Sequence, residues 1–186
     1  FAQKNVNVAV IEVGLGGRLD ATNIVTPRVS VITSLSYDHM AVLGKTLTLI
    51  AGEKAGIIKP GIPVVSSPQK EEAREVLERV AKAYHAPLTL VGQEVLFAAG
   101  EHSLDGQTLS VSCLKKAEGR RHEAGGGRQE TENIQESVIL RLPLLGQHQV
   151  VNAATAYAAL KASGLKVNDQ ALRKGCAEVT WPCRFE

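Results

Sequence analysis

Short apolar runs alternate with amphipathic stretches over the first half of the chain. The apolar runs are rich in β-branched residues and predict strands covered on both faces, at residues 6–11, 29–33, 62–65 and 88–91. Residues 46–59 and 68–84 carry apolar side chains at helical spacing, and Pro60-Gly61 is a stop signal for the first of these helices. Strands alternating with helices need crossover connections, so this order predicts an α/β fold with a mostly parallel sheet flanked by helices.

The pattern changes in the second half. Two alternating runs surround Asp105-Gly106 within residues 94–112, which predicts a small antiparallel β hairpin. Residues 114–136 are polar, glycine-rich and without periodicity, as is typical of a mobile surface loop. A strand at 137–142, an alanine-rich helix at 147–163 and a helix at 168–178 with Asn168 as its cap follow. We expect one domain over residues 1–186, with a β-rich subregion at 94–145.

Composition narrows the class of protein. With 44% hydrophobic residues and a net charge of +2, the 186-residue chain predicts a globular protein that binds neither nucleic acid nor a membrane. Three cysteines without Cys-x-x-Cys spacing argue against a disulfide framework or a zinc site and favour a reducing compartment. We therefore expect a cytoplasmic monomer that binds small molecules.

Both ends of the sequence predict a fragment of a longer protein. The chain begins at Phe1 without an initiator methionine and runs at once into a predicted strand, and it stops at Glu186 without a polar tail.

Glu12 directly follows the first predicted strand and precedes Gly14, Gly16 and Gly17. The carboxyl ends of parallel strands open into the ligand crevice, where a carboxylate can hold a hard cation. The alternative is a carboxylate satisfied beside a tight turn. The glycine cluster is not a dinucleotide fingerprint, because the third glycine is missing at the required spacing.

Two further side chains are candidates for the same edge of the sheet. His39 follows the second predicted strand and is a candidate metal ligand that Asp38 would orient, although an exposed loop histidine is the alternative. Lys54 lies on the inward stripe of the predicted helix. An unpaired buried ammonium is costly, so it needs an acidic partner, a modification or an extended path to water.

A second group of candidates lies near the carboxyl end. His148 and Asn152 are four residues apart at the start of the alanine-rich helix, where free N–H groups attract anions, and both could contact a nucleotide. Arg184 has the side chain that suits a phosphate.

Together these segments resemble the bacterial folylpolyglutamate synthase/dihydrofolate synthase family, a branch of the Mur ligases. The resemblance rests on five motifs in order: Glu-Val-Gly-Leu-Gly-Gly-Arg-Leu-Asp-Ala-Thr-Asn at 12–23, Asp-His-x-x-x-Leu-Gly at 38–44, Glu-Lys-Ala-Gly-Ile at 53–57, Gly-x-His-Gln-x-x-Asn-Ala at 146–153 and Trp-Pro-x-Arg-x-Glu at 181–186. The first motif separates the folate branch from the peptidoglycan branch.

The resemblance implies the central ATPase-type domain of a Mur ligase, with ATP and Mg²⁺ as cofactors. Glu12 and His39 would bind Mg²⁺, and Lys54 would be carbamylated so that its new carboxylate supports a second Mg²⁺. Lys54 and His39 are thus the candidate catalytic residues. Asn152 would contact the adenine nucleotide, with His148 beside it, and Arg184 would contact the phosphates.

The resemblance further implies that a folate or pteroate carboxylate attacks the γ-phosphate of ATP, and that glutamate displaces phosphate from the resulting acyl phosphate. The sequence departs from the family in three respects. It has no Gly-x-x-x-x-Gly-Lys-Ser/Thr phosphate loop, which in the family precedes the first strand here, and no glutamate-binding carboxy-terminal domain. Cys183 stands where the family usually has glycine, which weakens the assignment of Arg184.

Two alternative functions remain open. A peptidoglycan-precursor ligase would share the chemistry, but the Gly-Gly-Arg-Leu-Asp-Ala-Thr-Asn motif at residues 16–23 argues against this substrate. A non-catalytic nucleotide-binding module is favoured by the missing phosphate loop. For the same reason we expect this chain alone not to turn over.

Overall fold

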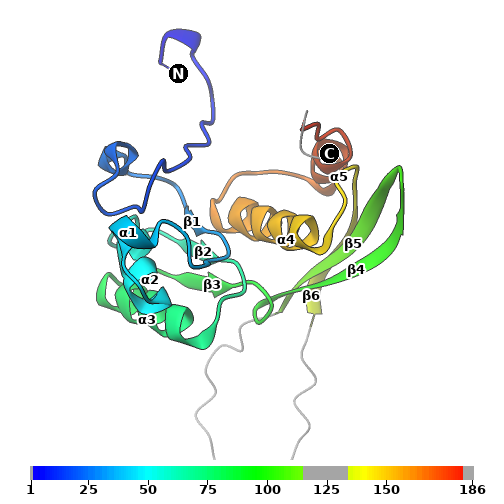
Figure 1. Cartoon of the computed structure of the whole chain (residues 1–186). Coiled ribbons are helices and arrows are strands. Elements are labelled where there is room, and N and C mark those ends of the chain that lie inside the picture. Colours follow the sequence, from blue (N-terminus) through cyan, green and yellow to red (C-terminus); the bar gives the residue numbers. More distant parts are fainter. Residues whose placement is uncertain (1, 115–133, 182–186) are drawn as a thin grey trace, which may run out of the picture. The chain divides into compact units, whose positions relative to one another are not determined.

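The computed structural model describes residues 2–114 and 134–181, which form two compact units (Figure 1). Unit 1 comprises Phe1–Val64 and Gln69–Leu88, and unit 2 comprises Val65–Pro68 and Thr89–Glu186.

A three-stranded parallel sheet has the order β1-β2-β3, formed by β1 (Ser30–Ile32), β2 (Val64–Ser66) and β3 (Leu88–Leu90). The Ser30 N–H donates to the Pro63 carbonyl at 2.9 Å, and the Val64 N–H donates to the Pro87 carbonyl at 2.8 Å. All three strands were expected from their apolar runs, and their parallel pairing is confirmed.

Two helices build the core of unit 1. Helix α2 (Leu47–Ala55) begins at Thr46, whose hydroxyl accepts from the Leu49 N–H, and it packs against α3 (Glu71–Ala83). One apolar cluster joins the two helices to the short helix α1 (Met40–Leu43), and a second joins them to the sheet. The second cluster contains Ile32, Ala55, Ile58, Val64, Leu77, Ala81 and Ala86.

The strand predicted at residues 6–11 is not formed. This segment follows the 3₁₀ turn η1 (Ala2–Lys4), pairs with no strand in the part of the chain that the structure describes, and leaves Val10 90% exposed. A fully apolar strand is stable only where neighbours cover both of its faces, and here none of the described elements does so.

Helix α2 ends at Ala55, four residues before the predicted boundary. The carbonyl of Glu53 accepts from the Arg18 N–H at 2.8 Å as well as from the Gly56 N–H. In the following turn the N–H groups of Ile57 and Ile58 donate to carbonyls only three residues earlier, those of Lys54 and Ala55. A loop distant in sequence therefore satisfies the end of this helix before Pro60 is reached.

Helix α3 begins at Glu71, not at Pro68 as predicted. The Gln69 amide donates to the Thr33 carbonyl at 2.8 Å and accepts from the Leu35 N–H at 3.0 Å. These two bonds hold Gln69 beside the segment that follows β1.

Unit 2 contains an antiparallel sheet of β4 (Val95–Ser103), β5 (Gly106–Leu114) and β6 (Ile134–Leu142), with β5 in the middle. Helix α4 (Gln147–Ala162) packs against β4 and β5 (Figure 1). Helix α5 (Asp169–Ala177) packs against β6. Side chains on β5 and β6 alternate, so that Leu109 pairs with Leu140 in the buried layer while Ile139 is exposed.

The hairpin forms as predicted, with its turn shifted by one residue to Leu104 and Asp105. Gly106 already pairs with Ser103, at φ +134°, and a Cβ there would lie 2.4 Å from the Leu142 carbonyl oxygen. Glycine at 106 therefore permits the close approach of β6. The mobile loop predicted at 114–136 overlaps the ends of β5 and β6, and its remainder, 115–133, lies outside the described residues.

The predicted helices at 147–163 and 168–178 are confirmed as α4 and α5, and the Asn168 side chain caps α5 by accepting from the Ala171 N–H at 2.8 Å. A buried polar chain lies beside them: Thr155 donates to the Val151 carbonyl, and its hydroxyl oxygen lies 2.8 Å from the buried Ser67 hydroxyl. Because the Thr155 proton is already used, Ser67 is the donor in this pair.

Candidate functional site

Residues 14–23 form a folded loop, here called the glycine loop, around the carboxylate of Asp20. This carboxylate accepts from the N–H groups of Gly14 and Leu15, both at 3.0 Å, and from the N–H and hydroxyl of Thr22. Asp20 also caps the 3₁₀ helix η2 (Ala21–Ile24). The hydrogen bonds from Thr22 and then from the loop amides lower the pKa of Asp20 to about 2.

The glycine loop lies directly against the carboxyl end of α2. The Arg18 guanidinium pairs with the Glu53 carboxylate at 2.9 Å. The same two residues are also joined by a backbone hydrogen bond from the Arg18 N–H to the Glu53 carbonyl. A Cβ on Gly56 would lie 2.4 Å from the Arg18 Cα, and a Cβ on Gly17 would lie 2.9 Å from the Glu53 carbonyl oxygen. Only glycine at these two positions allows such an approach.

Asn23 completes the attachment. Its side-chain amide donates to the carbonyls of Arg18 at 3.1 Å and Gly56 at 3.0 Å, and the Lys59 ammonium donates to the Asn23 carbonyl at 2.7 Å. The structure thus brings together the motifs at 12–23 and 53–57. Glu12 and Lys54 were expected near one edge of the sheet, but the contact between the glycine loop and the end of α2 was not predicted. The paired glycines at 16–17 and the glycine just beyond the helix were the signals that could have indicated it.

Two of the predicted magnesium ligands flank this attachment. Glu12 lies two residues before the glycine loop, with an exposed side chain that makes no hydrogen bond or ion pair within the described residues. Lys54 lies in the last turn of α2, directly after Glu53, and is half-buried. The acidic partner that sequence analysis considered for Lys54 is not found among the described side chains.

His39 occupies a strained position at the start of α1. Its backbone is left-handed, with φ +49°, and its side chain is exposed. The Asp38 carboxylate accepts from the His39 N–H at 2.7 Å and lies 3.5 Å from the ring Nε2. Over residues 2–114 and 134–181, no three His, Cys, Asp or Glu side chains gather in a way that could hold a metal ion by themselves.

The predicted nucleotide ligands lie in unit 2, at the start of α4. Gln107 donates to the carbonyls of Leu144 and Gly146 and so anchors the segment before this helix to β5. The exposed His148 ring lies close to Gly146, and the exposed Asn152 amide donates to the Gln149 side chain at 3.3 Å. Arg184 lies outside the described residues. The roles of these residues remain predictions.

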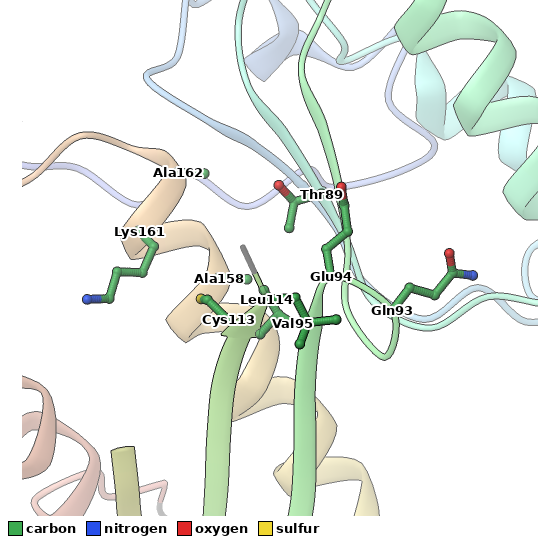
Figure 2. Close-up of a pocket in the computed structure, with 9 residues that line it drawn as sticks. All are labelled: Thr89, Gln93, Glu94, Val95, Cys113, Leu114, Ala158, Lys161 and Ala162. Atoms are coloured by element: carbon green, nitrogen blue, oxygen red, sulfur yellow. The ribbon is translucent and has the colours of Figure 1, made fainter. Parts of the chain in front are cut away.

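A separate pocket of about 410 Å³ opens in unit 2 between the strand ends and α4 (Figure 2). None of the predicted site residues lines it; its lining is Thr89, Gln93, Glu94, Val95, Cys113, Leu114, Ala158, Lys161 and Ala162. In Figure 2 the Lys161 and Gln93 side chains extend away from the centre on opposite sides, and Lys161 pairs with Glu136. Burial raises the pKa of the Cys113 thiol, which disfavours the reactive thiolate.

The fold and the glycine loop agree with a sequence comparison. The profile of the Mur ligase middle domain family matches residues 1–160, and the chain belongs to this family. Within the family, the chain is 36% identical to the dihydrofolate synthase/folylpolyglutamate synthase of Bacillus subtilis over 97% of its own length.

Solved structures give the same result. The apo form of the L. casei folylpolyglutamate synthase matches with a TM-score of 0.81 at 33% identity, covering 100% of this chain and 42% of that one. The Mycobacterium tuberculosis folylpolyglutamate synthase complexed with ADP matches with a TM-score of 0.80 at 34% identity, covering 100% and 38%. This chain spans only 39% of the Bacillus subtilis protein. In the described part of the chain, no helix has the length and apolar character to cross a membrane.

Proposed function

We propose that the protein to which this chain belongs is an ATP-dependent ligase that adds L-glutamate to dihydropteroate or to a folyl(poly)glutamate. The observation that carries this proposal is the similarity over 97% of the chain to a dihydrofolate synthase/folylpolyglutamate synthase. The attachment of the glycine loop to α2 supports it, because the motif that distinguishes the folate branch forms a defined structure there.

In the proposed reaction, a substrate carboxylate oxygen attacks the γ-phosphorus of ATP, and the bond to the β–γ bridging oxygen breaks to release ADP. The glutamate amine then attacks the acyl carbon, phosphate leaves, and the amine loses a proton to give the amide. Both steps depend on positioning and on stabilising the charge of the transferring phosphoryl group.

The residues in unit 1 fit a magnesium site completed by substrate. Mg²⁺ in phosphoryl-transfer enzymes is held by one or two carboxylates together with phosphate oxygens and water. The exposed carboxylate of Glu12, which has no hydrogen-bond or ion-pair partner among the described residues, matches this need, with His39 as the second proposed ligand. Bound Mg²⁺ would neutralise developing phosphate charge. A half-buried Lys54 is compatible with carbamylation, which would turn its ammonium into an oxygen ligand.

For ATP we propose contacts from Asn152, His148 and Arg184. His148 in the first turn of α4 and Asn152 in the second are both exposed, and a helix start presents free N–H groups to anions. The related Mycobacterium tuberculosis enzyme was solved with ADP, which agrees with a nucleotide as the ligand.

The test is a ligase assay on the longer protein that contains this chain. With ATP, Mg²⁺ and labelled glutamate, we expect ADP release and a glutamyl product from dihydropteroate or a folyl monoglutamate, and none from a UDP-sugar peptide. Glu12→Gln should lower kcat by at least about tenfold through loss of a metal ligand. Glu75→Gln, an exposed position on α3, is the matched control.

Each contrary outcome has a meaning. Turnover with only the UDP-sugar peptide would make the protein a peptidoglycan-type ligase. Tight ATP binding without turnover of any acid would make it a nucleotide-binding module.

Three narrower expectations accompany the proposal. The 186-residue chain by itself should not turn over, so ADP release at an enzyme's rate from this chain would contradict that expectation. The protein should act in the cytoplasm, since Cys113 and Cys176 are free thiols, and it should sediment as a monomer. Electron density beyond the Nζ atom of Lys54 in a crystal grown with bicarbonate would test carbamylation.

A further inference from the structure

The ion pair between Arg18 and Glu53 joins the two segments that carry proposed magnesium ligands. Glu53 directly precedes Lys54 on α2, while Arg18 belongs to the glycine loop, which begins two residues after Glu12. The loop is itself made rigid by Asp20, whose carboxylate fixes the Gly14 and Leu15 amides.

We infer that Arg18 and Glu53 are positioning residues for the proposed magnesium site: their ion pair holds the glycine loop, and with it Glu12, against the helical turn that bears Lys54. This inference rests on the proposed function. Neither residue is placed in contact with substrate; both act through the backbone segments that they connect.

The geometry of the pair is that of a specific attachment. The guanidinium Nη2 lies 2.9 Å from Glu53 Oε1, Nε lies 3.2 Å from the same oxygen, and the backbone N–H of Arg18 donates to the Glu53 carbonyl at 2.8 Å. One helical residue is therefore held through both its side chain and its backbone. The adjoining Gly17 and Gly56 remove the side chains that would keep the loop away.

The pair contributes little to global stability. An experiment can therefore distinguish a role in positioning the magnesium ligands from a role in folding stability. Its side chains are 58% and 29% exposed, and pairs of such exposure change a folding equilibrium by roughly a factor of five at most. A displacement of a reacting group by about 1 Å, in contrast, can cost on the order of a hundredfold in rate.

The experiment compares Glu53→Gln, Arg18→Gln and the charge swap Arg18→Glu/Glu53→Arg with Glu78→Gln. Glu78 pairs with Arg74 at 3.6 Å on α3 in the same unit and does not touch the glycine loop, so it is the matched control. The first measurement is hydrogen exchange over residues 14–23 in the 186-residue chain, which requires no turnover. We expect about two- to fivefold faster exchange there in both single variants, and recovery in the charge swap.

The second measurement uses the longer protein and records kcat, the KM for the folate substrate and the Mg²⁺ concentration at half-maximal rate. We expect kcat to fall by about tenfold or more and the required Mg²⁺ to rise, with KM for the folate unchanged and both changes partly reversed in the charge swap. Unchanged exchange in Glu53→Gln would overturn the attachment. Faster exchange with wild-type kcat and Mg²⁺ dependence would overturn the positioning role. If wild type has no ligase activity, the proposed function fails, while the exchange result still decides whether the ion pair holds the loop.

Discussion

The Asp20 carboxylate accepts a hydrogen bond from the N–H of Gly14, six residues earlier, at 3.0 Å. The same oxygen accepts from Leu15. The glycine loop thus owes its shape to one acidic side chain that replaces the regular backbone partners absent from a loop.

We predict that Asp20→Ala opens the amino-terminal half of this loop. The amides of Gly14 and Leu15 lose their acceptor, so their hydrogen exchange should accelerate, while amides in α3 keep their protection. Asp105→Ala, in the exposed hairpin turn, is the control and should leave residues 14–23 unchanged. Equal exchange in both variants would contradict the role of Asp20.

The order of the loop should also depend on pH in a defined window. The pKa of Asp20 is lowered from 3.8 to about 2, so the folded loop favours the charged carboxylate. Its contribution is complete above about pH 4 and is lost as the pH falls through about 2. The amide resonances of Gly14 and Leu15, followed by NMR, should titrate with a midpoint near 2; a midpoint near 4 would show that the carboxylate is not held in this way.

Two glycines of one helical region should respond oppositely to alanine. At Gly56 a Cβ would lie 2.4 Å from the Arg18 Cα, so Gly56→Ala should destabilise by about 1–3 kcal/mol through overpacking. At Gly52, within α2, a Cβ would meet nothing within 4 Å, so Gly52→Ala should stabilise by about 0.5–1 kcal/mol. Denaturant unfolding of the two variants measures both values, and a change of the same sign in both would argue against the close packing at Gly56.

The buried hydroxyl pair in unit 2 gives a prediction about asymmetry. Thr155→Val leaves the Ser67 proton without an acceptor and should cost about 1–3 kcal/mol, whereas Ser67→Ala leaves the bond from Thr155 to Val151 intact and should cost less. The double variant should be more stable than the sum of the single effects predicts. Simple additivity in chemical unfolding would show that the two hydroxyls are not coupled.

Local patterns predicted most of the elements and failed where distant residues decide. The helices at α4 and α5 follow from their own periodicity and caps, and the hairpin follows from its turn residues. The strand expected at residues 6–11 failed because strand formation requires partners that the segment's own sequence does not specify. Helix α2 ends at Ala55, earlier than predicted, because the N–H of Arg18, 35 residues before Glu53, donates to the Glu53 carbonyl at the end of the helix.

The candidate site was predictable as a set of segments but not as a set of contacts. Spacing after predicted strands indicated Glu12 and His39, although the strand expected before Glu12 is not formed, and helical position indicated Lys54. No periodic pattern links Arg18 to Glu53 or Asn23 to Gly56, because these contacts arise only when a loop folds onto a helix end.

Gln69 attaches a second segment, the one that leads to the proposed magnesium ligand His39, as Arg18 and Glu53 attach the glycine loop. The side-chain amide of Gln69, two residues before α3, binds two backbone groups beyond the end of β1, the Thr33 carbonyl and the Leu35 N–H. The backbone from Thr33 toward His39 is thereby connected to the segment that begins α3. A substitution at Gln69 would therefore change the position of His39 through the main chain, without a direct contact between the two side chains.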